Sequence, residues 1–319
     1  MSVLTGKAFA PSNIALVKYW GKRDEALRLP MNSSLSISLG DKGATAEISV
    51  IEDYVDRYIV NGNALAVESP HYTRLKNYVD RYLPAGLHVE VRLEFNIPFA
   101  AGLASSACCF ASIILALNAL FSWGLSTKEL SIRARLGSGS ACRSIEQGFI
   151  EWAMGEQQDG LDSYGVRLET IWPELCVGLC ILQKEPKKVS SSIGMQRTVD
   201  TSKLYSAWPS LANNDIKALK AAIIQKNFCK LGQISEQNAL SMHATMLASW
   251  PPLSYMTPDT LLLMQRVWRL RFDEKIPIYF TQDAGPNLKL LFESTEKDVI
   301  THEFPDLDIV YPFGKLDER

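Results

Sequence analysis

Glycines, serines and an arginine are concentrated in residues 137–145, GSGSACRSI. Glycines let a backbone approach a ligand, hydroxyl and N–H groups donate hydrogen bonds, and a guanidinium can grip a carboxylate or phosphate at two points. Gly and Ser are also the usual residues of turns, so a solvated loop is the simpler interpretation of this segment alone. The alternative is an anion pocket, and the rest of the chain must decide between them.

A carboxylate that could act as a general base follows an apolar run in YFTQDAGPNLKLLF, residues 279–292. Asp283 ends the run just before Gly285-Pro286. An aspartate there commonly caps a turn, and the functional alternative is a base at a strand end. We interpret His243, in NALSMHATML, as a packed or capping residue, since no motif makes a base of any histidine: His71, His88, His243 or His302.

Basic and neutral donors alternate in residues 13–39, NIALVKYWGKRDEALRLPMNSSLSISL. Lys18 lies in an apolar run beside Tyr19 and Trp20, where an unpaired ammonium would be costly, so it needs an anionic partner. A second stretch of this kind, KKVSSSIGMQRTVDTS at residues 187–202, is predicted to be a mobile loop.

A phosphate-binding junction is one interpretation of IPFAAGLASSACCF, residues 97–110, where a strand leads through Gly102, Ser105 and Ser106 into an apolar helix. Backbone N–H groups at a helix N-terminus attract anions. The GxxxxGK[ST] spacing is absent, and such loops also occur where a helix packs tightly on a strand.

Composition limits the partners that this chain can attract as a whole. Its 319 residues are 47% hydrophobic, enough for a substantial core in two domains or one large one. With 33 Lys and Arg against 35 Asp and Glu, the net charge of -2 predicts no general attraction to nucleic acid or to a membrane. Any anion site must therefore be local.

The cysteines and the N-terminus favour a reduced, cytoplasmic protein. The 6 cysteines lie in apolar or helical surroundings, and no signal-peptide pattern opens the sequence. Cys176 and Cys180 could suggest a metal, but no matching pair follows and we assign them to the core. The apolar residues 107–123 are short for a membrane span and are predicted to form a buried helix.

The order of predicted elements is that of an α+β protein, with a soft boundary near 180–200. Asn61-Gly62 is typical of a hairpin turn, and Ser126 with Glu129 forms a capping box. Strands are predicted at 13–21, 33–39, 44–52, 56–67, 87–95, 175–182, 276–283, 288–293 and 307–313. Helices are predicted at 71–83, 107–123, 126–136, 201–211, 214–225, 228–247 and 257–272.

Six segments in order resemble the mevalonate diphosphate decarboxylase family of the GHMP kinase superfamily: NIALVKYWGKRD, LPMNSSLS, AGLASSA, GSGSACRSI, MHATML and DAGPN. The resemblance covers nearly the whole chain. It implies a GHMP kinase fold with an N-terminal α+β domain, residues 1–185, packed on a ferredoxin-like C-terminal domain, residues 186–319. It also implies a homodimer.

The activity implied by the resemblance is that of a carbon–carbon lyase. Mevalonate 5-diphosphate and ATP, with Mg²⁺, would give isopentenyl diphosphate, ADP, phosphate and carbon dioxide. The alternatives are a phosphomevalonate decarboxylase, a kinase of the superfamily that does not decarboxylate, and a catalytically silent nucleotide-binding regulator. Asp283 with Lys18 and Arg143 favours decarboxylation, because a kinase has less need of a clamp on the carboxylate.

The resemblance also implies a role for each site residue. Asp283 would be the base, Lys18 would keep it ionised, and Arg143 would bind the departing carboxylate. Ser106 would face the metal or the phosphates. The implied substrate-binding residues are Tyr19, Lys22, Ser138, Ser140, Arg143, Ser191, Ser192 and Arg197, and the implied ATP-binding residues are Gly102, Leu103, Ala104, Ser105 and Ser106.

Three segments depart from the family pattern. Glu146 and Gln147 precede Gly148 where an aromatic residue and paired glycines are expected, and ACCF replaces a smaller pair after the ATP loop. The SSSIG segment lacks the charged residue of many relatives.

Overall fold

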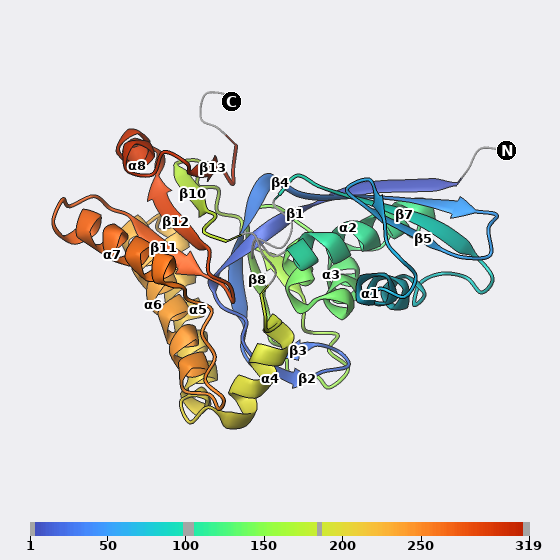
Figure 1. Ribbon diagram of the computed structural model, residues 1–319, viewed down its shortest axis with the longest axis horizontal. Helices are drawn as coiled ribbons and strands as arrows, with labels where there is room; N and C mark the ends of the chain where they lie inside the picture. The colour runs from blue at the N-terminus through green and yellow to red at the C-terminus, as the bar shows by residue number, and fades with distance from the viewer. Residues whose placement is uncertain (1–3, 98–104, 184–186, 315–319) are drawn as a thin grey trace.

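Two sheets flanked by helices make up the computed structural model of the chain, which describes residues 4–97, 105–183 and 187–314 (Figure 1). A seven-stranded sheet belongs to the N-terminal part and a four-stranded sheet to the C-terminal part. A two-stranded hairpin, β2 (Lys22–Asp24) with β3 (Leu29–Pro30), lies beside them.

The first sheet is built around the 18-residue strand β4. Its order is β6-β5-β7-β4-β8-β9, and β1 also pairs with β4. Among the strand pairs of the described residues, only β5 and β7 run parallel. The strands are β1 (Thr5–Val17), β4 (Ser34–Ile51), β5 (Arg57–Val60), β6 (Asn63–Ala64), β7 (His88–Phe95), β8 (Phe149–Trp152) and β9 (Gly165–Arg167).

Strand β4 replaces the two strands predicted at 33–39 and 44–52. Gly40 has a φ of 57°, in the left-handed region that favours glycine, and a Cβ on Gly43 would collide with the carbonyl of Ala10 on β1. The glycines therefore allow a bend and a close approach of two strands where the sequence suggested a turn.

Three helices pack against the first sheet: α1 (Pro70–Val79), α2 (Ser105–Leu120) and α3 (Thr127–Gly137) (Figure 1). The predicted capping box is confirmed, because Ser126 Oγ accepts from the N–H of Glu129 and the Glu129 carboxylate accepts from the N–H of Ser126. The predicted hairpin at Asn61-Gly62 is confirmed as well, with both residues at positive φ. Within the described residues, no helix has the length and apolar character needed to cross a membrane.

The second sheet has the strand order of a ferredoxin-like fold. The strands are β10 (Leu175–Cys180), β11 (Tyr279–Gln282), β12 (Leu288–Glu293) and β13 (Asp308–Val310). Their order β11-β12-β10-β13 is fully antiparallel and, with helices after the first and third strands, matches the β-α-β-β-α-β pattern. The predicted α+β class is therefore confirmed. The division into 1–185 and 186–319 stays a prediction, and β10 pairs with strands from beyond it.

Five helices accompany the second sheet: α4 (Ser191–Thr201), α5 (Trp208–Ile224), α6 (Phe228–Leu247), α7 (Pro258–Phe272) and α8 (Lys297–Glu303). Short 3₁₀ turns lie at Gly139–Arg143, Tyr205–Ala207 and Ser294–Glu296. The helix predicted at 228–247 is confirmed, and that at 257–272 begins one residue later.

Two predictions for this region are wrong. Residues 191–201 form helix α4 instead of a loop, because Ser190 caps it by accepting from the N–H of Ile193. The separate helices at 201–211 and 214–225 are replaced by α5, whose buried stripe continues through the predicted break with Ala212 and Ile216.

One hydrophobic core joins the two sheets. It contains Ile14 of β1 and Leu35 of β4 together with Val177 of β10 and Leu291 of β12, all 0% exposed. Elements that contribute to one core cannot shift independently, so side chains from both sheets can meet at fixed distances.

A buried ion pair fixes α7 against α6. Glu236 accepts from Trp268 Nε1 at 2.7 Å and from Arg271 at 2.7 and 2.8 Å, and Arg271 also donates to the carbonyl of Ile278 just before β11. The side chains of Arg271 and Glu236 are only 13% and 8% exposed. The pair therefore helps to place the strand that leads to Asp283.

We predict that Glu236→Gln lowers the free energy of unfolding by about 3 kcal/mol, because it leaves the Arg271 charge without its counter-charge. Denaturant unfolding measures this loss. Glu303→Gln is the matched control, since Glu303 pairs with the 41% exposed Arg266 and should cost less than about 1 kcal/mol. Equal losses in the two variants would contradict the role given to burial.

Candidate active site

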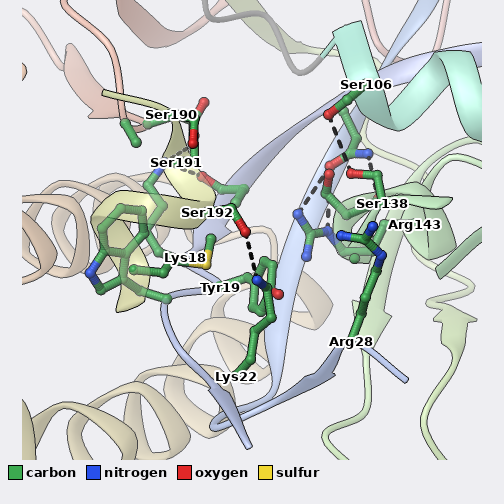
Figure 2. A pocket seen from close by; sticks show the side chains of 18 of the residues that line it. Lys18, Tyr19, Lys22, Arg28, Ser106, Ser138, Arg143, Ser190, Ser191 and Ser192 are labelled. Carbon is green, nitrogen blue, oxygen red and sulfur yellow. Dashed lines mark hydrogen bonds and ion pairs between the residues drawn. The ribbon is translucent and has the colours of Figure 1, made fainter. Parts of the chain in front are cut away.

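A cavity of about 630 Å³ lies where β1, α2, α4 and the segment after β11 converge (Figure 2). Its described lining is rich in hydroxyl groups and positive charges. The cations are Lys18, Lys22, Arg28, Arg74, Arg143 and Lys187, and Asp283 is the carboxylate among the described lining residues. The cavity therefore suits a ligand that carries several negative charges.

Asp283 is held between two buried lysines. Lys18 Nζ lies 2.8 Å from Oδ1 of Asp283, and Lys289 Nζ lies 3.1 Å from Oδ2. The lysine side chains are 2% and 1% exposed, whereas that of Asp283 is 27% exposed toward the cavity. Burial alone would raise the pKa of Asp283, but the two ammonium groups outweigh it and hold the pKa well below its usual range.

Lys18 is fixed as β1 ends. Its backbone N–H donates to Asn238 Oδ1 of α6 at 2.8 Å, and its ammonium also donates to the carbonyl of Ala15 at 2.7 Å. Burial lowers the pKa of Lys18 to about 8, although the Asp283 charge opposes this shift. The anionic partner that the sequence required of Lys18 is thus Asp283.

Histidine 243 lies behind this pair on α6 and is 2% exposed. Burial first, and then the charge of Lys18, lower the pKa of His243 to about 4. A neutral imidazole that does not line the cavity agrees with the interpretation of His243 as a packed residue.

Arg143 is buried on the opposite side of the cavity, in the 3₁₀ turn that follows α3. Its Nε and Nη2 both lie 3.3 Å from Asn13 Oδ1, and its Nη1 donates to Ser34 Oγ at 2.6 Å. Burial lowers the pKa of Arg143, but a guanidinium remains charged at neutral pH. Neutral partners leave that charge available to an anionic ligand.

The glycines of GSGSACR bring backbone and rings close together. A Cβ on Gly139 would lie 2.9 Å from both Tyr19 and Trp152, and one on Gly137 would meet the ring of Phe110. This packing places Ser138 Oγ 3.3 Å from Ser106 Oγ in the first turn of α2 (Figure 2). The segment is therefore part of the cavity wall and not a solvated loop.

Helix α4 contributes serines to two lysines. Lys22 Nζ donates to Ser192 Oγ at 2.7 Å (Figure 2). The same ammonium contacts the Glu25 carboxylate at 2.7 and 3.0 Å. Lys187 donates to Ser191 Oγ and to the carbonyl of Ala284, each at 2.7 Å. The N-terminal turn of α4 thus joins both sides of the cavity.

The structure brings most predicted site residues to this cavity. The described members are Lys18, Tyr19, Lys22, Ser105, Ser106, Ser138, Ser140, Arg143, Ser191, Ser192 and Asp283. Arg197 is not among the lining residues, and its guanidinium lies 3.5 Å from the carbonyl of Pro251. Gly102, Leu103 and Ala104 lie outside the described residues. The roles of all these residues stay predictions.

Four basic residues of this region were not assigned to the site from the sequence, and one of them is Lys187 of the stretch at residues 187–202. Lys289 lies in the apolar strand β12, so the burial argument used for Lys18 would have found it. Arg28 has a positive φ of 53° and donates to the carbonyl of Leu136 at 2.9 Å, while Arg74 stacks on Phe110. Neither position can be read from the sequence. The side chain of Arg28 is placed by the end of helix α3, and that of Arg74 is placed by the packing of helix α1.

The hydroxyl groups beside α2 suit a hard cation that is shared with phosphates. Ser106 offers an oxygen ligand next to Ser138, and Mg²⁺ usually binds few protein ligands together with substrate phosphates. In the part of the chain that is described, no group of three or more His, Cys, Asp or Glu could hold a metal by itself.

Cys176, which the sequence assigned to the core, is 0% exposed.

Two family models match the chain. The diphosphomevalonate decarboxylase-like N-terminal domain matches residues 10–165, and the mevalonate 5-diphosphate decarboxylase C-terminal domain matches residues 177–308. The two matches follow one another along the chain, as the two sheets do.

Similar proteins carry related names. The diphosphomevalonate decarboxylase mvd1 of Aspergillus fumigatus is 37% identical over 313 residues, which cover 91% of this chain and 77% of that protein. The mevalonate diphosphate decarboxylase of Staphylococcus aureus has a crystal structure with a TM-score of 0.90 and 36% identity, covering 97% of this chain and 96% of that one. A second solved structure, MDDEF in complex with MVAPP, AMPPCP and magnesium, has a TM-score of 0.88 and 37% sequence identity to this chain, with 97% of both chains covered.

We predict a pH effect on stability from Lys18. Between about pH 8 and 10.5 the unfolded chain still holds the proton that folded Lys18 has released. The free energy of unfolding therefore rises with pH across this window, by up to about 1.4 kcal/mol per pH unit. Lys18→Met lacks this contribution, so the stability difference between wild type and variant should rise with pH.

Denaturant unfolding of both proteins at several pH values between 7 and 10 measures that difference. Every other titrating group is shared and largely cancels. If the stability difference between wild type and Lys18→Met did not change with pH, the pKa of Lys18 would not be lowered in the folded protein. If the difference fell as the pH rises, the pKa of Lys18 would be raised.

Proposed function

The chain belongs to the mevalonate 5-diphosphate decarboxylase family, and we propose that the cavity described above carries out the reaction of that family. Mevalonate 5-diphosphate and ATP give isopentenyl diphosphate, ADP, phosphate and carbon dioxide. The observation that carries the proposal is the Asp283 carboxylate between two ammonium groups, in one cavity with Arg143. This arrangement offers a proton acceptor and a carboxylate clamp together.

Arg143 binds the substrate carboxylate in this proposal. Its guanidinium is oriented by Asn13 and Ser34, and a planar fork of donors matches two carboxylate oxygens. The grip directs the carboxylate away from Asp283, so the two negative groups do not compete for one position.

The diphosphate of the substrate is bound by serines and basic residues around GSGSACR and α4. Tyr19 lines the cavity, and its buried hydroxyl has no hydrogen-bond partner among the described residues. Lys22 already donates to Ser192, and it can move from Glu25 to a phosphate of higher charge. The proposed set is Tyr19, Lys22, Ser138, Ser140, Ser191 and Ser192, with Arg197 added by family resemblance alone.

ATP binds at the N-terminal turn of α2, where Ser105 and Ser106 line the cavity. Backbone N–H groups at a helix N-terminus favour phosphate. Mg²⁺ would be held by Ser106 together with the ATP phosphates and would neutralise their charge during phosphoryl transfer. Gly102, Leu103 and Ala104 belong to this proposal by resemblance.

Asp283 positions the C3 hydroxyl and accepts its proton as the γ-phosphoryl group moves to that oxygen. Because bonding to phosphorus makes this proton strongly acidic, a carboxylate whose pKa is lowered can still accept it. The C3–O bond then breaks and releases phosphate, and the bond to the carboxylate breaks and releases carbon dioxide. The electron pair of the second bond forms the new double bond. The carboxylate of Asp283 also opposes the positive charge that develops at C3.

We further propose that the protein is cytoplasmic and acts as a homodimer. The buried or half-buried state of most cysteines agrees with a reducing compartment. The homodimer rests on the family resemblance.

We predict that mevalonate 5-diphosphate with Mg²⁺ and ATP gives ADP and carbon dioxide in equal amounts. The six cations among the described lining residues match a diphosphate and a nucleotide better than a neutral substrate. The assay follows both products separately with mevalonate that carries no, one or two phosphates. ADP without carbon dioxide would indicate a kinase, and carbon dioxide from the monophosphate alone would indicate a phosphomevalonate decarboxylase.

A further inference from the structure

Lys289 reaches the carboxylate of Asp283 from below the cavity. It lies in β12, opposite Thr281 of β11 and Leu179 of β10. Its ammonium is 3.1 Å from Oδ2 of Asp283 and 3.4 Å from the carbonyl of Asn287. Lys289 is not among the residues that line the cavity. It therefore acts on a ligand indirectly, through the groups that do line the cavity, and Asp283 is the one whose carboxylate it contacts.

A lysine at this position is costly for the fold. Its neighbours in β12 are Leu288, Leu290, Leu291 and Phe292, all 0% exposed, and Lys289 itself is 1% exposed. Removing an ammonium from water costs several kcal/mol, whereas an apolar side chain of similar length would be stabilised by the same surroundings. Packing alone gives no reason for a charge here.

The two lysines come from different sheets, and each contacts a different carboxylate oxygen of Asp283. Lys18 follows β1 of the first sheet and binds Oδ1, and Lys289 belongs to the second sheet and binds Oδ2. A carboxylate with one partner can still rotate about its Cβ–Cγ bond, whereas contacts to both oxygens fix that rotation. The pair of contacts thus defines the direction in which Asp283 faces the cavity.

We propose that Lys289 is a positioning residue for the reaction, which holds Asp283 in its productive orientation and balances its charge together with Lys18. The proposal rests on the proposed function. Lys289 does not touch the substrate, so its removal should lower kcat and leave the KM values for both substrates nearly unchanged.

Lys289 also affects the protonation of Lys18. The two ammonium groups share one carboxylate, and the charge of Lys289 contributes to the lowered pKa of Lys18, about 8. Without Lys289, the pKa of Lys18 should rise. The charged or titratable groups around Asp283 are Lys18, Lys187, Lys289, Arg143 and His243.

The test compares Lys289→Met with wild type in kcat, KM and the pH dependence of kcat. We expect kcat to fall by roughly 10- to 100-fold, as misplaced catalytic groups typically cause, and each KM to stay within about threefold under the same reasoning. Burial lowers the pKa values of both Lys18 and Lys187 to about 8, and Lys289 contributes to both shifts, so a basic limb near pH 8 should move to higher pH in the variant. Leu291→Val is the control, because it removes a methylene group from the same face of β12 and should leave the limb in place.

Three results would overturn the proposal. The first is an unchanged kcat, and the second is a change in KM alone. The third is a lower kcat in Lys289→Met together with a basic limb of the kcat–pH profile that stays in place and a melting temperature that falls as much as in Leu291→Val. The last result would show that Lys289 only fills space. If Lys289→Met does not fold, Lys289→Gln provides the same test, because it is neutral but keeps a hydrogen-bond donor.

The unfolding experiment separates this proposal from the proposed function, since it needs no substrate. The pH window in which stability rises should begin at higher pH in Lys289→Met than in wild type. An unshifted window would overturn the coupling of the two lysines even in an active enzyme. A shifted window in a protein that releases no carbon dioxide would instead locate the failure in the proposed function.

Discussion

The ion pairs of Asp283 with Lys18 and Lys289 are the interaction on which the cavity depends. All three groups leave bulk water, which costs several kcal/mol per ion unless the geometry is accurate. The observed separations of 2.8 and 3.1 Å meet that condition. One lysine follows a strand of the first sheet and the other belongs to the second sheet, so the shared hydrophobic core must hold the two sheets at a fixed relative position. The ion pairs therefore depend on the packing of the core.

Local rules predicted the elements whose signals lie within one segment. The apolar helix α2, the capping box at Ser126 and the hairpin at Asn61-Gly62 need only neighbouring residues. The errors came where one pattern serves two structures. Serines near residue 190 are typical of loops and equally of N-caps, and the outcome depended on a buried face for α4 that the rest of the chain supplies.

The candidate site was predictable where burial conflicts with charge. Lys18 was recognised because an ammonium in an apolar run needs a partner, and Lys289 could have been recognised in the same way. Arg28 and Arg74 could not, since their positions in the cavity depend on carbonyls at the end of α3 and on the ring of Phe110. Tertiary contacts of this kind leave no trace in sequence spacing.

The most direct test is the turnover of Asp283→Asn, measured with substrate affinity and melting temperature on one preparation. Asparagine has nearly the same shape but cannot accept the proton, so turnover should fall by roughly 10²–10⁴-fold while mevalonate 5-diphosphate and ATP still bind. The melting temperature should also fall, because two buried lysines lose their counter-charge. Turnover within a few-fold of wild type, with reduced stability alone, would show that Asp283 only caps a turn and would contradict the account.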